Sequence, residues 1–156
     1  MAIWSRALPG SRIWYVEQQG LLIELGRNLI MPSNPSTNSL RFLIVDDHAA
    51  FRLILRQWVE SHLHWSVLAE ARDGREATQL AQAYRPDVIL MDVIMPIMNG
   101  IEATSQIHQQ APNSRIVLFS ASYEEEFVLA GIQAGAAGLI WKGQLCEINL
   151  EEIVNS

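Results

Sequence analysis

The chain has 156 residues, 49% of them hydrophobic, and a formal net charge of −6. This allows one ordinary domain with a proper core and argues against a disordered chain. The acidic balance disfavours direct binding to DNA, and the single cysteine, Cys146, excludes an internal disulfide. No apolar run approaches the roughly 18 residues of a membrane-spanning helix, so we expect a cytoplasmic protein that does not bind membranes.

Residues 1–39 are interpreted as an N-terminal extension and linker. The stretch "MPSNPSTNS" (31–39) is rich in Pro, Ser and Asn, which predicts a flexible linker and places the domain boundary before residue 40. The aromatic residues and scattered arginines before it fit a small amphipathic docking segment. The alternative interpretation is that translation naturally begins at Met31, so that the preceding residues are not native.

From residue 41, apolar runs alternate with stretches of helical spacing. The apolar runs predict five strands, at residues 41–45, 65–71, 87–91, 115–120 and 138–141. The intervening stretches and the end of the chain predict helices, at residues 49–62, 74–84, 100–109, 123–134 and about 145–154. This alternation predicts a single doubly wound α/β domain at residues 40–156, with a five-stranded parallel sheet covered on both faces.

Polar side chains stand where the predicted strands end. Asp46 and Asp47 follow the first strand, Asp92 the third, Ser120 ends the fourth and Lys142 follows the fifth. In open doubly wound sheets the functional crevice lies outside the carboxyl ends of the strands. Each residue alone has a simpler explanation, such as a helix cap or a turn. Together they predict one site with three carboxylates, a hydroxyl and an ammonium group.

This set of groups suits phosphoryl chemistry beside a divalent cation. Three neighbouring carboxylates raise one another's pKa unless a cation is present, and Mg²⁺ prefers one or two carboxylates together with phosphate oxygens. A carboxylate can act as the nucleophile in phosphoryl transfer. Asp92, at the centre of the edge, is the predicted nucleophile, with Lys142 neutralising charge on the phosphoryl oxygens.

Four motifs carry a family resemblance, in this order: "IVDDH", "VILMDVIMPIMNGIEAT", "RIVLFSAS" and "AGAAGLIWK". Over roughly residues 40–155 the chain resembles the receiver domain of bacterial two-component response regulators, which implies a flavodoxin-like fold. The segment "YEEEFVLAGIQAGAAG" resembles the subfamily that usually carries a helix-turn-helix output domain. The sequence ends at residue 156, so we expect a stand-alone receiver or one truncated from a DNA-binding regulator.

The resemblance implies a role for each acidic residue. Asp92 would accept a phosphoryl group from a sensor histidine kinase or a phosphotransfer protein. Asp47 would bind Mg²⁺ directly, Asp46 would act largely through water, and the backbone carbonyl of Ile94 would be a further ligand, with Asp92 completing the metal site. A phosphatase of the haloacid dehalogenase type is disfavoured, because Ile94 stands where those enzymes place a second Asp.

The resemblance also implies how the signal leaves the site. Ser120 would be the switch hydroxyl, favoured over Ser122 because it directly ends the apolar run, and Lys142 would contact the phosphoryl group. Leu139 stands where receivers commonly have Tyr or Phe, so the usual aromatic switch is absent. Trp141 is next to Lys142, so it is expected to point to the face of the strand opposite to Lys142, and it is not assigned that role.

The expected output is a contact with another protein. Phosphorylation would bias the face made by the fourth helix, fifth strand and fifth helix toward binding an output protein or a second copy of the chain. No direct DNA binding is expected, and no enzymatic activity beyond self-phosphorylation and self-dephosphorylation. The alternative is a receiver-like interaction module that is never phosphorylated.

Overall fold

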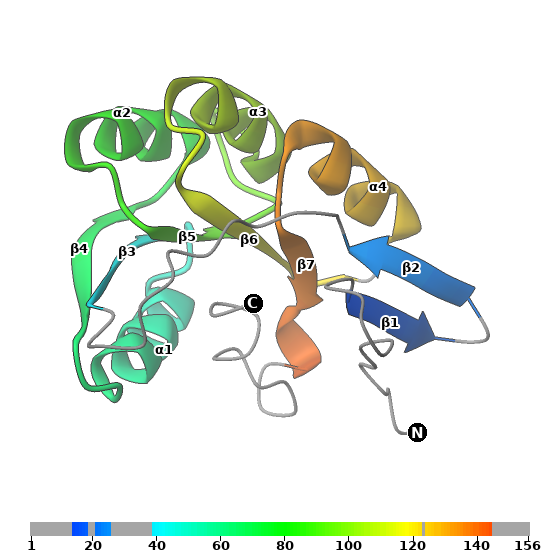
Figure 1. Cartoon of the computed structure of the whole chain (residues 1–156), viewed down its shortest axis with the longest axis horizontal. Helices are drawn as coiled ribbons and strands as arrows, with labels where there is room; N and C mark the ends of the chain where they lie inside the picture. Colours follow the sequence, from blue (N-terminus) through cyan, green and yellow to red (C-terminus); the bar gives the residue numbers. More distant parts are fainter. Residues whose placement is uncertain (1–13, 19–20, 26–38, 123, 145–156) are drawn as a thin grey trace. The chain divides into compact units, whose positions relative to one another are not determined.

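The computed structural model describes residues 14–18, 21–25, 39–122 and 124–144 (Figure 1). The chain divides into two compact units, one made of Met1–Asn34 with Asn149–Ser156 and the other of Pro35–Ile148. Among the described residues, no helix has the length and apolar character needed to cross a bilayer.

The first unit contains a β-hairpin that the sequence analysis did not predict. Strands β1 (Trp14–Gln18) and β2 (Leu21–Leu25) pair antiparallel, with Gln18 opposite Leu21. The signal that was missed is Gly20 in a two-residue connection between short runs of strand-forming residues, which is a common hairpin pattern.

The second unit contains a five-stranded sheet, and this confirms the predicted fold class. Its strands are β3 (Leu40–Val45), β4 (Trp65–Ala71), β5 (Val88–Asp92), β6 (Arg115–Ser120) and β7 (Gly138–Trp141). All neighbours pair in parallel, in the order β4-β3-β5-β6-β7. Strand order reverses between β3 and β5, as in flavodoxin-like folds, which places a crevice at their carboxyl ends.

Helices cover both faces of the sheet, as predicted. The described helices are α1 (Ala49–Glu60), α2 (Gly74–Tyr84), α3 (Gly100–Gln110) and α4 (Glu125–Ala134). Figure 1 shows α2, α3 and α4 on one face and α1 on the other. A 3-10 turn, η1 (Lys142–Gln144), follows β7. The helix predicted at about 145–154 lies outside the described residues.

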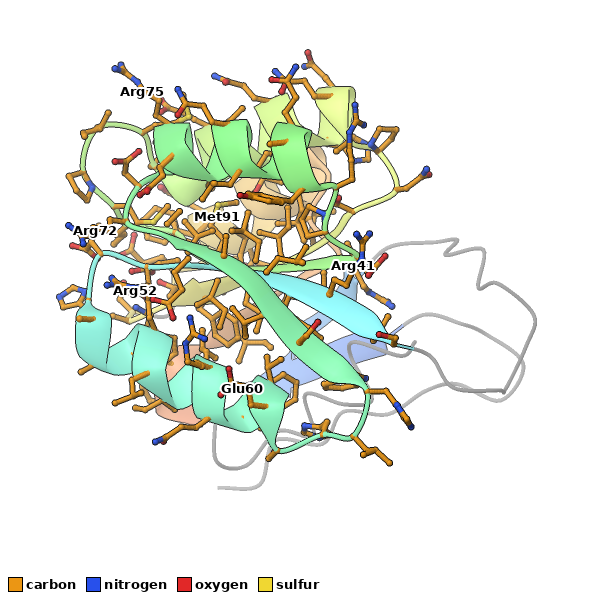
Figure 2. The ribbon with its side chains drawn as sticks, turned by 90° about the vertical axis from the view of Figure 1, so that its left-hand side faces the viewer. Arg41, Arg52, Glu60, Arg72, Arg75 and Met91 are labelled. Atoms are coloured by element: carbon orange, nitrogen blue, oxygen red, sulfur yellow. The ribbon has the colours of Figure 1, made fainter. Side chains whose placement is uncertain are left out.

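Alternate side chains of the central strands point to opposite faces and make the core. Met91 points toward the layer of α2 and α3 (Figure 2), where it packs with Ala77 and Ile107. On the other face, Phe42 contacts Trp58 of α1 with ring centroids 6.3 Å apart. All five residues of β5 are buried, which explains why its sequence reads as a continuous apolar run ending in Asp92.

Candidate functional site

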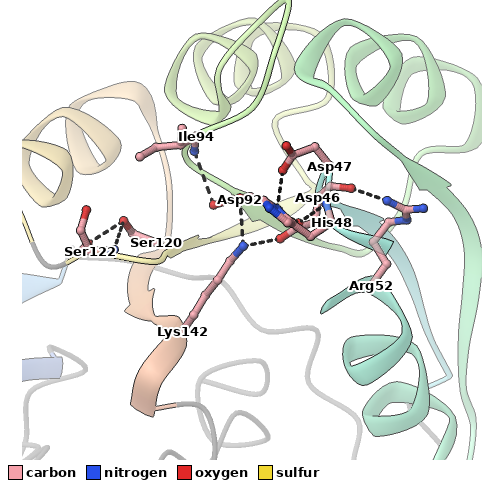
Figure 3. Close-up of polar contacts among 9 residues, drawn as sticks. All are labelled: Asp46, Asp47, His48, Arg52, Asp92, Ile94, Ser120, Ser122 and Lys142. Atoms are coloured by element: carbon pink, nitrogen blue, oxygen red, sulfur yellow. Dashed lines mark hydrogen bonds and ion pairs between the residues drawn. The ribbon is translucent and has the colours of Figure 1, made fainter. Parts of the chain in front are cut away.

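The polar strand ends lie at one edge of the sheet (Figure 3). Asp46 follows β3, Asp92 is the last residue of β5, and Lys142 directly follows β7. The side chains of Asp46 and Asp92 are almost completely buried, with 1% and 5% exposed. The structure therefore brings two of the predicted carboxylates and the predicted lysine together, from three strands far apart in the sequence.

Lys142 joins the two buried carboxylates. Its Nζ atom donates hydrogen bonds to Asp46 Oδ2 at 2.6 Å and to Asp92 Oδ2 at 2.9 Å. The same atom lies 4.4 Å from the centre of the Phe51 ring, an arrangement typical of a cation–π contact. Burial alone would lower the pKa of Lys142, but its bonds to both aspartates outweigh burial and raise the pKa. The lysine therefore stays charged.

For Asp92, in contrast to Lys142, burial outweighs the hydrogen bond between the two side chains. Burial raises the pKa of its carboxyl group, and the hydrogen bond from Lys142 opposes this without cancelling it. The amide of Ile94 also points at Asp92, with its nitrogen 3.4 Å from Oδ1. A cation bound beside Asp92 would therefore stabilise its ionised form, which burial disfavours.

The remaining acidic residue lies at the mouth of the site. The side chain of Asp47 is 33% exposed, and its Oδ1 lies 2.8 Å from Nδ1 of His48. Ligand atoms of Asp46, Asp47, His48 and Asp92 all lie within 4.8 Å of one another. Carboxylate oxygens are the ligands that Mg²⁺ prefers, so the three aspartates of this group fit the ion. His48 was not predicted to join this group, although it directly follows the two aspartates.

Helix α1 anchors the first strand end. Arg52 Nη1 donates to the backbone carbonyl of Asp46 at 2.6 Å, and its Nε donates to Glu70 of β4 at 3.0 Å. The amide of His48 donates to Asp46 Oδ1 at 2.8 Å, which orients that carboxylate. The sequence did not predict this role of Arg52, because the position of a residue in a helical pattern does not indicate which backbone group its side chain contacts.

A close approach of the backbone fixes the other strand end. Gly100, the first residue of α3, donates from its amide to the carbonyl of Val93 at 2.8 Å. A Cβ atom at Gly100 would overlap the carbonyl oxygen of Asp92. Asn99 caps the helix by accepting from the amide of Glu102 at 2.9 Å. The "NG" pair thus holds α3 directly against the strand end that carries Asp92.

The predicted switch hydroxyl is engaged within its own loop. Ser120 is fully buried, and its hydroxyl donates to the carbonyl of Ser122 at 2.6 Å. The hydroxyl of Ser122 in turn donates to Glu124 at 3.0 Å. The indole Nε1–H of Trp141 donates to the carbonyl of Ala121 at 2.9 Å, a contact that sequence reasoning did not predict.

Comparison with known proteins agrees with this geometry. Residues 42–155 match the family model of the response regulator receiver domain. The transcriptional regulatory protein DegU of Brevibacillus brevis is 32% identical over 79% of this chain and 52% of its own length. The chemotaxis protein CheY of Thermotoga maritima is 39% identical over 65% of this chain and 84% of its own length.

Among solved structures, the response regulator domain of Thermotoga maritima CheB superposes with a TM-score of 0.69 at 33% identity. The alignment covers 76% of this chain and 98% of that domain. The chain spans about half the length of DegU. With the family model matched over most of its length and the same fold, the chain belongs to the response regulator receiver domain family.

Proposed function

We propose that this receiver domain accepts a phosphoryl group on Asp92, in an Mg²⁺-dependent reaction, from a sensor histidine kinase or a phosphotransfer protein. The observation that carries the proposal is the position of Lys142, whose ammonium group joins the buried carboxylates of Asp46 and Asp92. A partly buried, charged lysine held at the strand edge beside a carboxylate of raised pKa is suited to stabilise phosphoryl oxygens.

Each residue of the site has a role in the proposed reaction. An Oδ atom of Asp92 attacks phosphorus, the bond from phosphorus to the donor breaks, and the donor leaves with that electron pair. The ammonium group of Lys142 turns from the carboxylate to the new phosphoryl oxygens. Asp46, Asp47, Asp92 and the carbonyl of Ile94 would hold Mg²⁺, which supplies charge neutralisation when bound.

The proposed output is a contact and not turnover of a substrate. A phosphoryl group adds about −1.5 to −2 charges and three strong acceptor oxygens, toward which Ser120 and Lys142 are drawn. This biases the face that contains α4 and β7 toward binding an output protein or a second copy of the chain. The chemistry of the domain itself is limited to gaining and losing its phosphoryl group, in the cytoplasm, without contact to DNA or membrane.

The second candidate function is an interaction module that never becomes phosphorylated. It is favoured by the resting contacts of the site, because Lys142 and Ser120 already have hydrogen-bond partners without a phosphoryl group. The two functions differ in what happens to Asp92, so they are separated by one chemical measurement.

The test is the intact mass of the protein after incubation with acetyl phosphate, with and without Mg²⁺. We expect one phosphoryl adduct that requires Mg²⁺ and disappears in Asp92→Asn. The matched control is Asp87→Asn, which changes an aspartate beside the amino end of β5, paired with Arg41, and should leave the adduct unchanged. An adduct that survives in Asp92→Asn would mean a different acceptor. A folded, Mg²⁺-binding protein without any adduct would favour the interaction module.

A further inference from the structure

Position 139, where receivers commonly carry an aromatic residue, is Leu in this chain, which leaves open how the site communicates with the surface. Trp141 lies two residues further along β7, and its position in the sheet is directly opposite Ser120 of β6. The indole is 37% exposed, so one end of the side chain reaches solvent. The other end, Nε1–H, bonds to the carbonyl of Ala121, the residue that follows the switch hydroxyl.

The indole ring is held in this position from two sides. Its N–H group is fixed by Ala121, and its six-membered ring lies against the backbone of Gly143, where a Cβ atom would come within 2.8 Å of Cζ2. Gly143 therefore leaves the space that the ring fills. The adjacent residue in sequence is Lys142, whose ammonium group lies 2.9 Å from Asp92. One strand end thus touches both the acceptor carboxylate and the loop after Ser120.

Hydrogen bonds of two kinds hold the loop after Ser120 in the resting structure. Two are internal: the Ser120 hydroxyl donates to the carbonyl of Ser122, and the amide of Ser122 donates back to the Ser120 hydroxyl oxygen. The other comes from Trp141 to the carbonyl of Ala121. If the Ser120 hydroxyl turns to a phosphoryl oxygen, both bonds between its side chain and the backbone of Ser122 are lost, and this restraint on the loop backbone is removed. The carbonyl of Ala121 lies between these two residues, so any movement of the loop backbone acts directly on the indole bond.

We propose that Trp141 is the positioning residue that couples the Ser120 loop to strand β7: its indole N–H holds the resting loop, and phosphorylation releases it. The inference rests on the proposed function, because the release is driven by a phosphoryl group on Asp92. Release changes the orientation of an exposed aromatic side chain at the end of β7, so the chemical state of the buried site alters the surface through Trp141. This role needs Trp at position 141 and Gly at position 143.

The test uses the full chain labelled with 5-fluorotryptophan and observed by ¹⁹F NMR. The five tryptophans give separate signals, and the signal of Trp141 is identified by its loss in Trp141→Phe. The ligand is Mg²⁺ with beryllofluoride, a phosphoryl mimic whose bound form has its own ¹⁹F signal. We expect the Trp141 signal to shift as bound beryllofluoride appears, while the Trp65 signal stays in place.

The outcomes separate the inference from the proposed function. Bound beryllofluoride with an unmoved Trp141 signal would overturn the inference alone. If beryllofluoride does not bind, the proposed function fails and the inference fails with it. The spectrum therefore reports on both in one sample, and the unmoved Trp65 signal shows that the fold is intact.

A second measurement distinguishes the effect of the Trp141 N–H group from the packing of its ring. Trp141→Phe keeps an aromatic ring and removes the N–H group that restrains the resting loop. Because one neutral hydrogen bond is worth about 1 kcal/mol, the variant should be phosphorylated by acetyl phosphate about five-fold faster than the wild type. The matched control, Trp65→Phe, changes a tryptophan at the start of β4 and should leave the rate unchanged. A rate in Trp141→Phe that is unchanged or slower would overturn the inference.

Discussion

The carboxyl group of Asp92 is buried, and its raised pKa means that ionisation costs free energy in the folded protein. The folded protein holds the proton more tightly than the unfolded chain does, so the contribution of this group to stability falls as the pH rises past the ordinary Asp pKa. We expect Asp92→Asn to raise the free energy of unfolding by roughly 1 kcal/mol at pH 7.5. Urea unfolding of both proteins measures it.

The pH dependence and a control variant test the cause of this change. The advantage of Asp92→Asn should shrink as the pH is lowered through the folded pKa, because the wild-type carboxyl becomes neutral as well. Asp87→Asn alters an exposed pair with Arg41 and should change stability by less than about 1 kcal/mol. A variant at Asp92 that is less stable than the wild type at pH 7.5 would show that the bond to Lys142 outweighs the cost of burial.

At the scale of elements, Glu70 ties α1 to β4. Burial raises its pKa, but the hydrogen bonds from Arg56 at 2.8 Å and Arg52 at 3.0 Å outweigh burial and lower the pKa. A lowered folded pKa means that this stability is present above the unfolded pKa and is lost as the pH falls through the folded pKa. Glu70→Gln should therefore cost roughly 1 kcal/mol at pH 7, and much less near pH 3.

Urea unfolding at the two pH values measures this difference, and Glu60 provides the matched control. Glu60 is 52% exposed and pairs with Arg56 one helical turn away. Glu60→Gln should change stability by only a few tenths of a kcal/mol, because exposed helical pairs contribute little. An equal loss in Glu70→Gln at both pH values would show that shape and not charge holds the helix to the strand.

The loop between β5 and α3 contains a strained residue. Ile97 has a φ angle of +69°, a region that β-branched residues rarely adopt, and its side chain is 71% exposed. Ile97→Gly removes the strain and loses little burial, so we expect a gain of about 1 kcal/mol in the free energy of unfolding. Thermal unfolding measures it.

The control is Ile94→Gly, which changes another exposed isoleucine of the same loop, one whose φ angle is not positive. Glycine there only adds freedom to the unfolded chain, so stability should fall. If both variants are destabilised, the conformation of Ile97 costs less than glycine's extra freedom in the unfolded chain.

Sequence patterns predicted the elements of the sheet because buried parallel strands leave a continuous apolar signal. The predicted β6 and β7 coincide with the structure, and β5 is shifted by one residue because Asp92 still pairs with Phe119. Helix α1 ends at Glu60, two residues before the predicted end at residue 62, because a helical pattern does not fix where the last turn frays. The hairpin of β1 and β2 was missed because its runs are short and lie before a linker-like segment.

At the scale of the whole molecule, the predicted strand topology was sufficient to locate the site, whereas the individual side-chain contacts could not be predicted from the sequence. Lys142 and Asp46 are 96 positions apart, yet the parallel order of the strands brings both to one edge. The roles assigned to these residues stay predictions. The contacts of Phe51, Arg52 and Trp141 were not foreseen, because each depends on the direction of one side chain across a gap between elements.

The predicted domain boundary before residue 40 can be tested by shortening the chain. Every strand of the parallel sheet and every described helix that covers it falls within Pro35–Ile148, one compact unit with its own buried core. We therefore expect a chain that begins at Met31 to keep the same free energy of unfolding within about 0.5 kcal/mol. It should also form the Mg²⁺-dependent adduct at the same rate, measured by intact mass.

A chain that begins at Ile44 is the matched control, because it removes most of β3, the strand that pairs with both β4 and β5. This control should lose cooperative unfolding. If the chain from Met31 also lost stability or phosphorylation, residues 1–30 would be part of the folded receiver and the boundary would lie earlier. If it behaved like the full chain, the hairpin would be free to serve a separate purpose, and its deletion would then be tested on partner binding.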